Sequence, residues 1–335
     1  MINIAVVGAG NWGKNLVRAF SGLENAKLHT CCDLNVELLR NLRKTYPLTN
    51  FTSELKDVLN NREIDGVVVA SSAATHFEIA KAVLSSGKHV FVEKPLCLNE
   101  KHVLELIELS GKRSLKLLVG HLLLYHPAVR LAKKIIEEKK LGDVLYAYSQ
   151  RLNLGVVRTQ ENALWSLAPH DISVILYLFG EEPHSVSCRG GAYLQKKENV
   201  EDVIFLNINF KSGRIGHIHA SWLDPNKARR TTVIGTKKML VFDDMEVKDK
   251  VRVYDKGADI TIPDLRKFSL RDGGCETPEV SAEEPLKLEC GHFVRCIKNG
   301  DKPFTDGHNG LEVVRVLCAA EKSLKNSGVT ERIKK

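Results

Sequence analysis

A glycine-rich turn directly after a short apolar run constrains the fold of this chain more than any other feature. Residues 2–7 are mostly apolar and β-branched, the pattern of a buried parallel strand. Gly8, Gly10 and Gly13 follow in the spacing G-x-G-x-x-G, and a helical pattern begins at about residue 12. This strand–turn–helix context is typical of a dinucleotide-binding loop, in which the backbone and the helix N-terminus hold a pyrophosphate. We therefore expect cofactor contacts from Gly8, Gly10, Asn11, Trp12 and Gly13.

An acidic residue at the end of the next predicted strand indicates which dinucleotide is bound. The strand pattern at residues 26–32 ends at Asp33, 20 positions after Gly13. A carboxylate there accepts hydrogen bonds from the adenosine ribose and repels a 2′-phosphate, which favours NAD over NADP. We also assign Ser71, Thr75 and His76, which follow a third predicted strand, to the cofactor site. Thr75 is a candidate helix N-cap, and a plain surface position is the alternative for His76.

Strand and helix patterns alternate through the first part of the chain. Apolar strand patterns at 2–7, 26–32, 64–70, 89–93 and 115–120 are separated by helical patterns at 12–21, 37–45, 75–86 and 103–110. Such alternation with short loops predicts an α/β domain with a parallel sheet, of the Rossmann type. We place this NAD-binding domain at residues 1–121.

The rhythm changes after about residue 121. Longer strand patterns lie at 144–152, 203–210, 214–222 and 230–235, and helical patterns lie at 127–140, 169–179, 286–298 and 311–325. The later strands alternate apolar and polar residues, as a sheet with one solvated face does. We therefore expect residues 122–335 to form an α+β domain with an open, mainly antiparallel sheet, which binds the substrate and a second copy of the chain.

Composition limits the classes of partner. The 335 residues include 49 Lys+Arg and 41 Asp+Glu, a formal net charge of +8, with 6% aromatic residues. The basic residues form no long block, which argues against nucleic acid as a partner. No apolar stretch approaches the roughly 20 residues of a membrane span, and eight cysteines without a CxxC pair indicate reduced thiols in a cytoplasmic protein. Four histidines, His121, His126, His217 and His219, lack a carboxylate at suitable spacing, so no metal site is predicted.

Glu93-Lys94-Pro95 ends the predicted strand at 89–93, on the sheet edge where open α/β proteins bind ligands. A partly desolvated lysine beside a cationic cofactor exchanges a proton near neutral pH. We include Glu93 and Lys94 in the cofactor site. From the residues alone, a surface ion pair between the two side chains is the more common alternative.

Several motifs occur in a fixed order along the chain. They are residues 8–13, Thr75-His76, Glu93-Lys94-Pro95, Gly120 with His126-Pro127, and Pro169-His170-Asp171. Together they resemble the Gfo/Idh/MocA oxidoreductases, a family named after glucose–fructose oxidoreductase, inositol dehydrogenase and rhizopine-catabolism proteins. The resemblance implies a Rossmann domain with an open-sheet substrate domain, and hydride transfer between a sugar carbon and nicotinamide. It also implies that Lys94 is essential for catalysis.

The family's second motif is usually Asp-x-x-x-His on a helix. Here His170 matches the histidine, whereas Ser166 stands where many members have the aspartate. A histidine suits proton transfer from the reacting hydroxyl, because its unperturbed pKa lies near neutrality. We expect His170 to be catalytic and its orientation to be set by Asp171 or by a backbone carbonyl, with a purely structural histidine as the alternative.

Residues 165–171, 220–225, 227–233 and 242–245 resemble the branch of this family that acts on nucleotide-linked amino sugars. The resemblance implies oxidation of a UDP-linked N-acetyl sugar, UDP-N-acetylglucosamine, at C3, with the 3-keto product passing to a PLP-dependent aminotransferase. Arg229 or Arg230 is a candidate clamp for the diphosphate through paired N–H donors. Further candidate substrate contacts are Tyr125, Asn162, Trp165 and Ser166.

Other functions remain open at this point. The substrate is alternatively a UDP-N-acetyl uronic acid, a free sugar or an inositol, and a non-catalytic NAD-binding sensor has the same cofactor motif. The resemblance also implies a homodimer or homotetramer.

Overall fold

The structure is a computed structural model, and it describes residues 1–155, 157–159, 161–262 and 267–334. The chain divides into two compact units. The first unit comprises Met1–Tyr125 and Glu283–Arg315, and the second comprises His126–Ala282 and Val316–Lys335.

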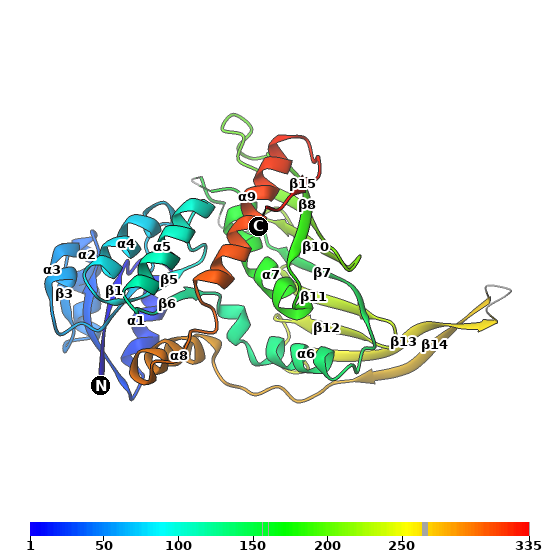
Figure 1. Cartoon of the computed structure of the whole chain (residues 1–335), viewed down its shortest axis with the longest axis horizontal. Helices are drawn as coiled ribbons and strands as arrows, with labels where there is room; N and C mark the ends of the chain where they lie inside the picture. Colours follow the sequence, from blue (N-terminus) through cyan, green and yellow to red (C-terminus); the bar gives the residue numbers. More distant parts are fainter. Residues whose placement is uncertain (156, 160, 263–266, 335) are drawn as a thin grey trace. The chain divides into compact units, whose positions relative to one another are not determined.

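The first unit is built on a six-stranded parallel sheet in the order β3-β2-β1-β4-β5-β6 (Figure 1). Its strands are β1 (Ile2–Val7), β2 (Ala26–Cys32), β3 (Asn50–Thr52), β4 (Gly66–Val69), β5 (His89–Glu93) and β6 (Leu117–Gly120). Its helices are α1 (Gly13–Ser21), α2 (Val36–Thr45), α3 (Leu55–Asn60), α4 (His76–Ser85) and α5 (Glu100–Lys112), with short 3-10 turns at Ala73–Thr75 and Leu122–Tyr125. The strand order reverses between β1 and β4, and ligands of such sheets bind at this switch point. The Rossmann prediction is confirmed, although β3 and α3 are too short to be apparent in the sequence.

The first unit also takes in a segment from near the end of the chain. From the sequence we placed all of residues 122–335 in a second domain, but residues 283–315 belong to the first unit. The reason is apolar packing by α8 (Pro285–Asn299), which contacts α1 and β1. Leu286, Cys290 and Phe293 of α8 lie in one core cluster with Ile4 and Phe20, so removal of this helix would leave an apolar face of the unit in water.

The second unit contains a nine-stranded sheet in the order β14-β13-β12-β11-β7-β10-β9-β8-β15. Its strands are β7 (Val144–Leu152), β8 (Pro183–Gly191), β9 (Val203–Phe210), β10 (Ile215–Ser221), β11 (Ala228–Gly235), β12 (Met239–Asp243), β13 (Val251–Ile262), β14 (Lys267–Glu276) and β15 (Glu331–Arg332). The pairs are antiparallel except β7 with β10, so the predicted sheet is confirmed. The sequence did not reveal β8 or β12–β14.

Helix α7 (Ala163–Phe179) packs against β7 and β10, and α6 (Pro127–Glu137) packs against α7 (Figure 1). The last long helix is α9 (Gly307–Lys325). We expected α7 to begin at Pro169, but it begins six residues earlier. Its N-cap is Asn162, whose side chain accepts a hydrogen bond from the N–H of Trp165. Pro169 lies inside the helix. An early cap of this kind stabilises the first turn and overrides the tendency of proline to mark a helix start.

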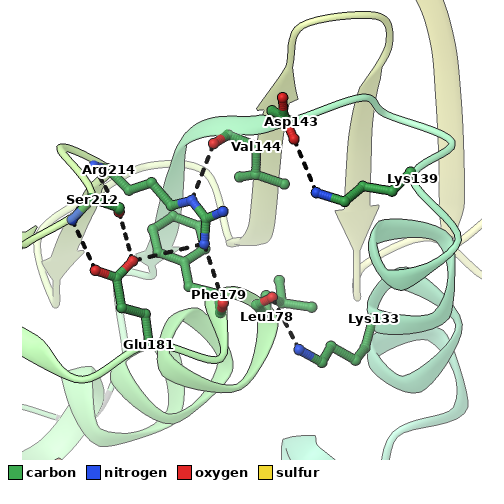
Figure 2. Close-up of polar contacts among 9 residues, drawn as sticks. All are labelled: Lys133, Lys139, Asp143, Val144, Leu178, Phe179, Glu181, Ser212 and Arg214. Carbon is green, nitrogen blue, oxygen red and sulfur yellow. Dashed lines mark hydrogen bonds and ion pairs between the residues drawn. The ribbon is translucent and has the colours of Figure 1, made fainter.

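Cations hold the C-terminal end of α7, as Figure 2 shows. The guanidinium of Arg214 donates to the carbonyl oxygen of Phe179 at 3.3 Å, and the Lys133 ammonium donates to that of Leu178 at 3.4 Å. Glu181 pairs with Arg214 at 3.8 Å. Positive groups at this end satisfy open carbonyls and oppose the negative pole of the helix, which fixes the helix that carries His170.

Within the part of the chain that the structure describes, no helix is both long and apolar enough to cross a bilayer.

Candidate active site

The loop between β1 and α1 contains three glycines, and the fold requires glycine at two of these positions. Gly8 has φ +90°, and a Cβ there would lie 2.7 Å from the backbone of Ala70. A Cβ on Gly13 would lie 1.9 Å from the carbonyl oxygen of Gly8. A Cβ on Gly10 would meet no described protein atom within 4 Å, so packing does not require glycine at this position. Helix α1 has no side-chain cap, and the N–H groups of Lys14 and Asn15 donate instead to the carbonyl oxygens of Gly10 and Trp12 at 3.2 and 2.8 Å.

Asp33 connects the end of β2 with this loop. One carboxylate oxygen accepts the N–H of Ala9 at 2.7 Å, and the other accepts the N–H of Asn35 at 2.8 Å. The carboxylate is only partly buried, so its remaining lone pairs are open to a ligand. Hydrogen bonds within the protein therefore hold the predicted ribose-binding residue against the glycine loop.

Glu93 is a buried residue that receives hydrogen bonds from two cofactor-site candidates. Its carboxylate accepts the indole N–H of Trp12 at 2.5 Å and the backbone N–H of Lys94 at 3.2 Å, and the residue is 6% exposed. Burial raises the pKa of Glu93 to about 7, against the lowering effects of the Trp12 hydrogen bond and the Lys94 charge. The surface position that we considered for Glu93 is therefore wrong.

His76 links the carboxyl ends of β4 and β5. Its Nδ1 lies 2.8 Å from the carbonyl oxygen of Pro95, which follows a cis peptide bond after Lys94, and its Nε2 lies 3.1 Å from that of Ser71. His76 is 1% exposed, so the surface alternative is wrong for this residue too. Thr75 occupies the N-cap position without capping through its side chain; its hydroxyl contacts that of Ser71 at 2.7 Å.

Three residues of the first unit were not recognised as parts of the site. His121 follows β6, and its Nδ1 lies 2.6 Å from Oδ1 of Asn309. Glu289 of α8 is fully buried, and its carboxyl group interacts electrostatically with that of Glu93. The sequence gives little indication of these residues, because their partners lie far away in the chain.

Tyr125, which we expected to contact substrate, lies in the interior of the first unit. It is 1% exposed, and its hydroxyl is 3.1 Å from that of Thr305. Tyr125 therefore has a packing role.

In the second unit, the residue after His170 is not available to orient it. The Asp171 carboxylate accepts the hydroxyl of Ser149 at 2.5 Å and the guanidinium of Arg151 at 2.6 and 3.2 Å. It is 2% exposed and turned toward the sheet. The expectation that Asp171 sets the His170 ring is therefore wrong. Ser166 lies one helical turn before His170, so the two side chains share one face of α7.

The start of α7 holds the other candidate contacts of this unit. Asn162 donates to the Glu201 carboxylate at 2.8 Å in addition to capping the helix. Trp165 is 7% exposed, so it presents little surface to a ligand.

Arg229 and Arg230 lie on opposite faces of the sheet, because adjacent residues of a strand alternate. Arg230 donates to Oε1 of Gln150 at 2.9 Å. Arg229 stands opposite Arg151 in the register of β11 and β7, and its nearest carboxylate, Asp244, is 3.9 Å away. Burial and then repulsion by Arg151 lower the pKa of Arg229. The two arginines cannot clamp one diphosphate together.

No cluster of three or more His, Cys, Asp or Glu side chains suited to a metal ion occurs among the residues with described positions.

Two family models match the chain. A model described as an oxidoreductase family with an NAD-binding Rossmann fold matches residues 2–121, and the GFO/IDH/MocA C-terminal domain matches residues 129–241.

Individual relatives have similar identities and different named activities. A 2,7-anhydro-N-acetylneuraminate hydratase of Escherichia coli is 25% identical, with 100% of this chain and 97% of the relative covered. A myo-inositol 2-dehydrogenase of Thermotoga maritima is 26% identical, with 97% and 96% covered. A UDP-N-acetylglucosamine 3-dehydrogenase of Acidithiobacillus ferrooxidans is 27% identical, with 77% of each covered. Such close values do not select one substrate.

Solved structures show the same fold. The UDP-N-acetylglucosamine 3-dehydrogenase GnnA from Acidithiobacillus ferrooxidans has a TM-score of 0.81 at 20% identity, covering 97% of this chain and 98% of that one. GenD2 from gentamicin A biosynthesis, in complex with NAD, has a TM-score of 0.84 at 23% identity, covering 100% and 97%.

Proposed function

The chain belongs to the Gfo/Idh/MocA family of oxidoreductases, and we propose that it oxidises the C3 hydroxyl of a UDP-linked N-acetyl amino sugar, UDP-N-acetylglucosamine, with NAD as the hydride acceptor. The observation that carries the redox part is the preformed loop of Gly8, Gly10 and Gly13, with Asp33 fixed against it. The Asp33 carboxylate favours NAD over NADP, because a 2′-phosphate would meet a like charge.

Lys94 is the proposed proton acceptor. Bound NAD supplies a carbon that accepts a hydride. As the C–H electron pair leaves the sugar, the hydroxyl proton passes to the neutral amine of Lys94, so that a ketone and an ammonium result. His170 is the second proposed catalytic residue. In place of the carboxylate found in many relatives, Ser166 shares the helix face of His170, and Ser166 is 6% exposed. The side chain of Asn162 at the start of α7 is a proposed contact for the hydroxyl groups of the substrate.

The substrate class rests on Arg229. Asp244, the carboxylate 3.9 Å from Arg229, is also shared with Lys250 at 3.4 Å and His126 at 3.4 Å. The Arg229 guanidinium is half-buried, lies opposite another arginine, and shares its counterion with two other groups. An anionic ligand therefore stabilises its charge more than it would stabilise an arginine that is already paired with its own carboxylate. A diphosphate fits this requirement, and so does the carboxylate of a UDP-N-acetyl uronic acid. A free sugar or an inositol carries no such charge.

A homodimer is the proposed assembly. Tyr146, Phe205 and Ile215 are between 43% and 46% exposed on neighbouring strands β7, β9 and β10, and apolar side chains gathered on one sheet face favour burial against a second copy. A ketone is chemically suited to a PLP-dependent aminotransferase, which is the proposed next enzyme.

The test is NADH formation, followed at 340 nm, with UDP-N-acetylglucosamine, its uronic acid and myo-inositol as parallel substrates, each with NAD and with NADP. We expect turnover with the UDP-sugars and NAD. Lys94→Ala should lower kcat at least about 100-fold, in keeping with loss of an acid–base group, while NADH binding persists. Lys101→Ala, at an exposed lysine of α5, is the matched control. Full turnover by Lys94→Ala would refute the role of Lys94, and turnover of myo-inositol alone would refute the substrate class.

A further inference from the structure

His121 lies beside Lys94 at the carboxyl edge of the first sheet. Strands β5 and β6 are parallel neighbours, with Val92 opposite Val119 and Glu93 opposite Gly120. Lys94 and His121 are the residues that directly follow these two strands. Because neighbouring parallel strands are separated by about 4.8 Å, the two residues leave the sheet at adjacent positions of the same edge. The charge of Lys94 accordingly acts on the His121 ring.

Asn309 fixes the protonation of the His121 ring. The amide oxygen of Asn309 can only accept, so His121 Nδ1, 2.6 Å away, carries the hydrogen. In a neutral imidazole Nε2 is then an acceptor. Asn309 is itself held in place, since its N–H donates to Asp306 at 3.0 Å. The segment before it exchanges two 2.7 Å hydrogen bonds with β6, between Thr305 and Val119.

The surroundings keep this imidazole neutral. His121 is 2% exposed, and its burial lowers its pKa to about 4; the Asn309 hydrogen bond opposes this shift and the Lys94 charge adds to it. Further titratable groups on adjoining elements include His89 and Glu93 on β5, Glu289 and His292 on α8, and Asp306 before α9. Asp306 is paired with Lys302 at 2.8 Å.

We propose that His121 is a positioning residue for Lys94: its Nε2 accepts a hydrogen bond from the Lys94 nitrogen and directs the remaining lone pair or proton of that nitrogen toward the sugar hydroxyl. Asn309 is the second member of this arrangement, because it selects the tautomer with a free Nε2. When the hydroxyl proton reaches Lys94, the new ammonium keeps one N–H on His121, and no proton is transferred to the imidazole. This inference rests on the proposed role of Lys94.

The first test is independent of substrate. Competitive acetylation of the lysines with acetic anhydride, followed by mass spectrometry over a pH series, reports the pKa of the Lys94 amine. An acceptor stabilises the ammonium form, so His121→Leu should lower the pKa of Lys94 by about 0.5 or more. His121→Gln, which keeps an acceptor oxygen, should restore it. His308→Leu, at an exposed histidine next to Asn309, should leave it unchanged.

The second test is kinetic. With the best UDP-sugar, His121→Leu should lower kcat about 10-fold or more and move the acidic limb of the kcat–pH profile to lower pH, with KM and NADH affinity unchanged. Asn309→Ala should move the limb in the same direction by a smaller amount, which keeps the test valid where His121→Leu fails to fold. An unshifted Lys94 pKa and an unshifted limb in both variants would overturn the inference, even if kcat fell. If Lys94→Ala is inactive in the same assays, the proposed function survives that outcome; if Lys94→Ala is active, the proposed function itself fails.

Discussion

The buried carboxyl group of Glu289 in α8 provides a quantitative test of how its burial affects stability. Both of its carboxyl oxygens are buried, and neither has a hydrogen-bond partner among the residues that the structure describes. Burial first, and then the neighbouring Glu93, raise the pKa of Glu289 well above 4.5. A carboxyl group with a raised pKa in the folded state binds a proton on folding, so stability is lost as the pH rises above the unfolded-state pKa.

The magnitude follows from the proton-binding difference. Above the unfolded-state pKa, the unfolded chain loses the Glu289 proton while the folded protein keeps it. The free energy of unfolding then falls by about 1.4 kcal/mol per pH unit. The loss grows by this amount with each pH unit above the unfolded-state pKa for as long as the folded protein keeps the proton on Glu289. Glu289→Met removes the titrating group and replaces it with an apolar side chain that adapts to the site, so this variant should exceed the wild type in stability at pH 7 and approach it at pH 5.

The assay is urea unfolding of both proteins at pH 5 and pH 7, without cofactor. Glu24→Met, at an exposed position in the first unit, is the control and should change stability by less than about 0.5 kcal/mol at either pH. Equal wild-type and Glu289→Met stabilities at pH 7, or a difference that does not depend on pH, would refute the reasoning that Glu289 is held protonated.

Three further predictions concern the glycine loop and Arg229. Gly13→Ala should destabilise the protein by more than about 2 kcal/mol in thermal or urea unfolding, because its Cβ would lie 1.9 Å from the Gly8 carbonyl oxygen. Gly10→Ala should keep wild-type stability and lose NADH affinity in a fluorescence titration; unchanged affinity would contradict a cofactor at this loop. Arg229→Gln should raise KM for a UDP-sugar about 10-fold or more, because the variant loses a charge-assisted hydrogen bond to the substrate. Arg230→Gln, on the opposite face, should not, and equal effects of the two variants would contradict the assignment.

The sequence determined the features that depend on neighbouring residues. The glycine spacing after a buried strand, Asp33 at the end of the next strand and Lys94 at the end of β5 are all local, so periodicity and motif spacing located them. The opposite faces of Arg229 and Arg230 also follow from the two-residue period of a strand, although we treated the pair as interchangeable.

Only the tertiary structure decided the features that depend on residues far apart in the chain. Asn309 reaches His121 across 188 positions, and α8 returns to cover β1 and α1. Glu289 reads as an ordinary charged residue of an amphipathic helix, yet that helix buries it next to Glu93. The local sequence does not predict which side chain will be desolvated. Desolvation and the choice of hydrogen-bond partner arise only when separate segments of the chain pack together.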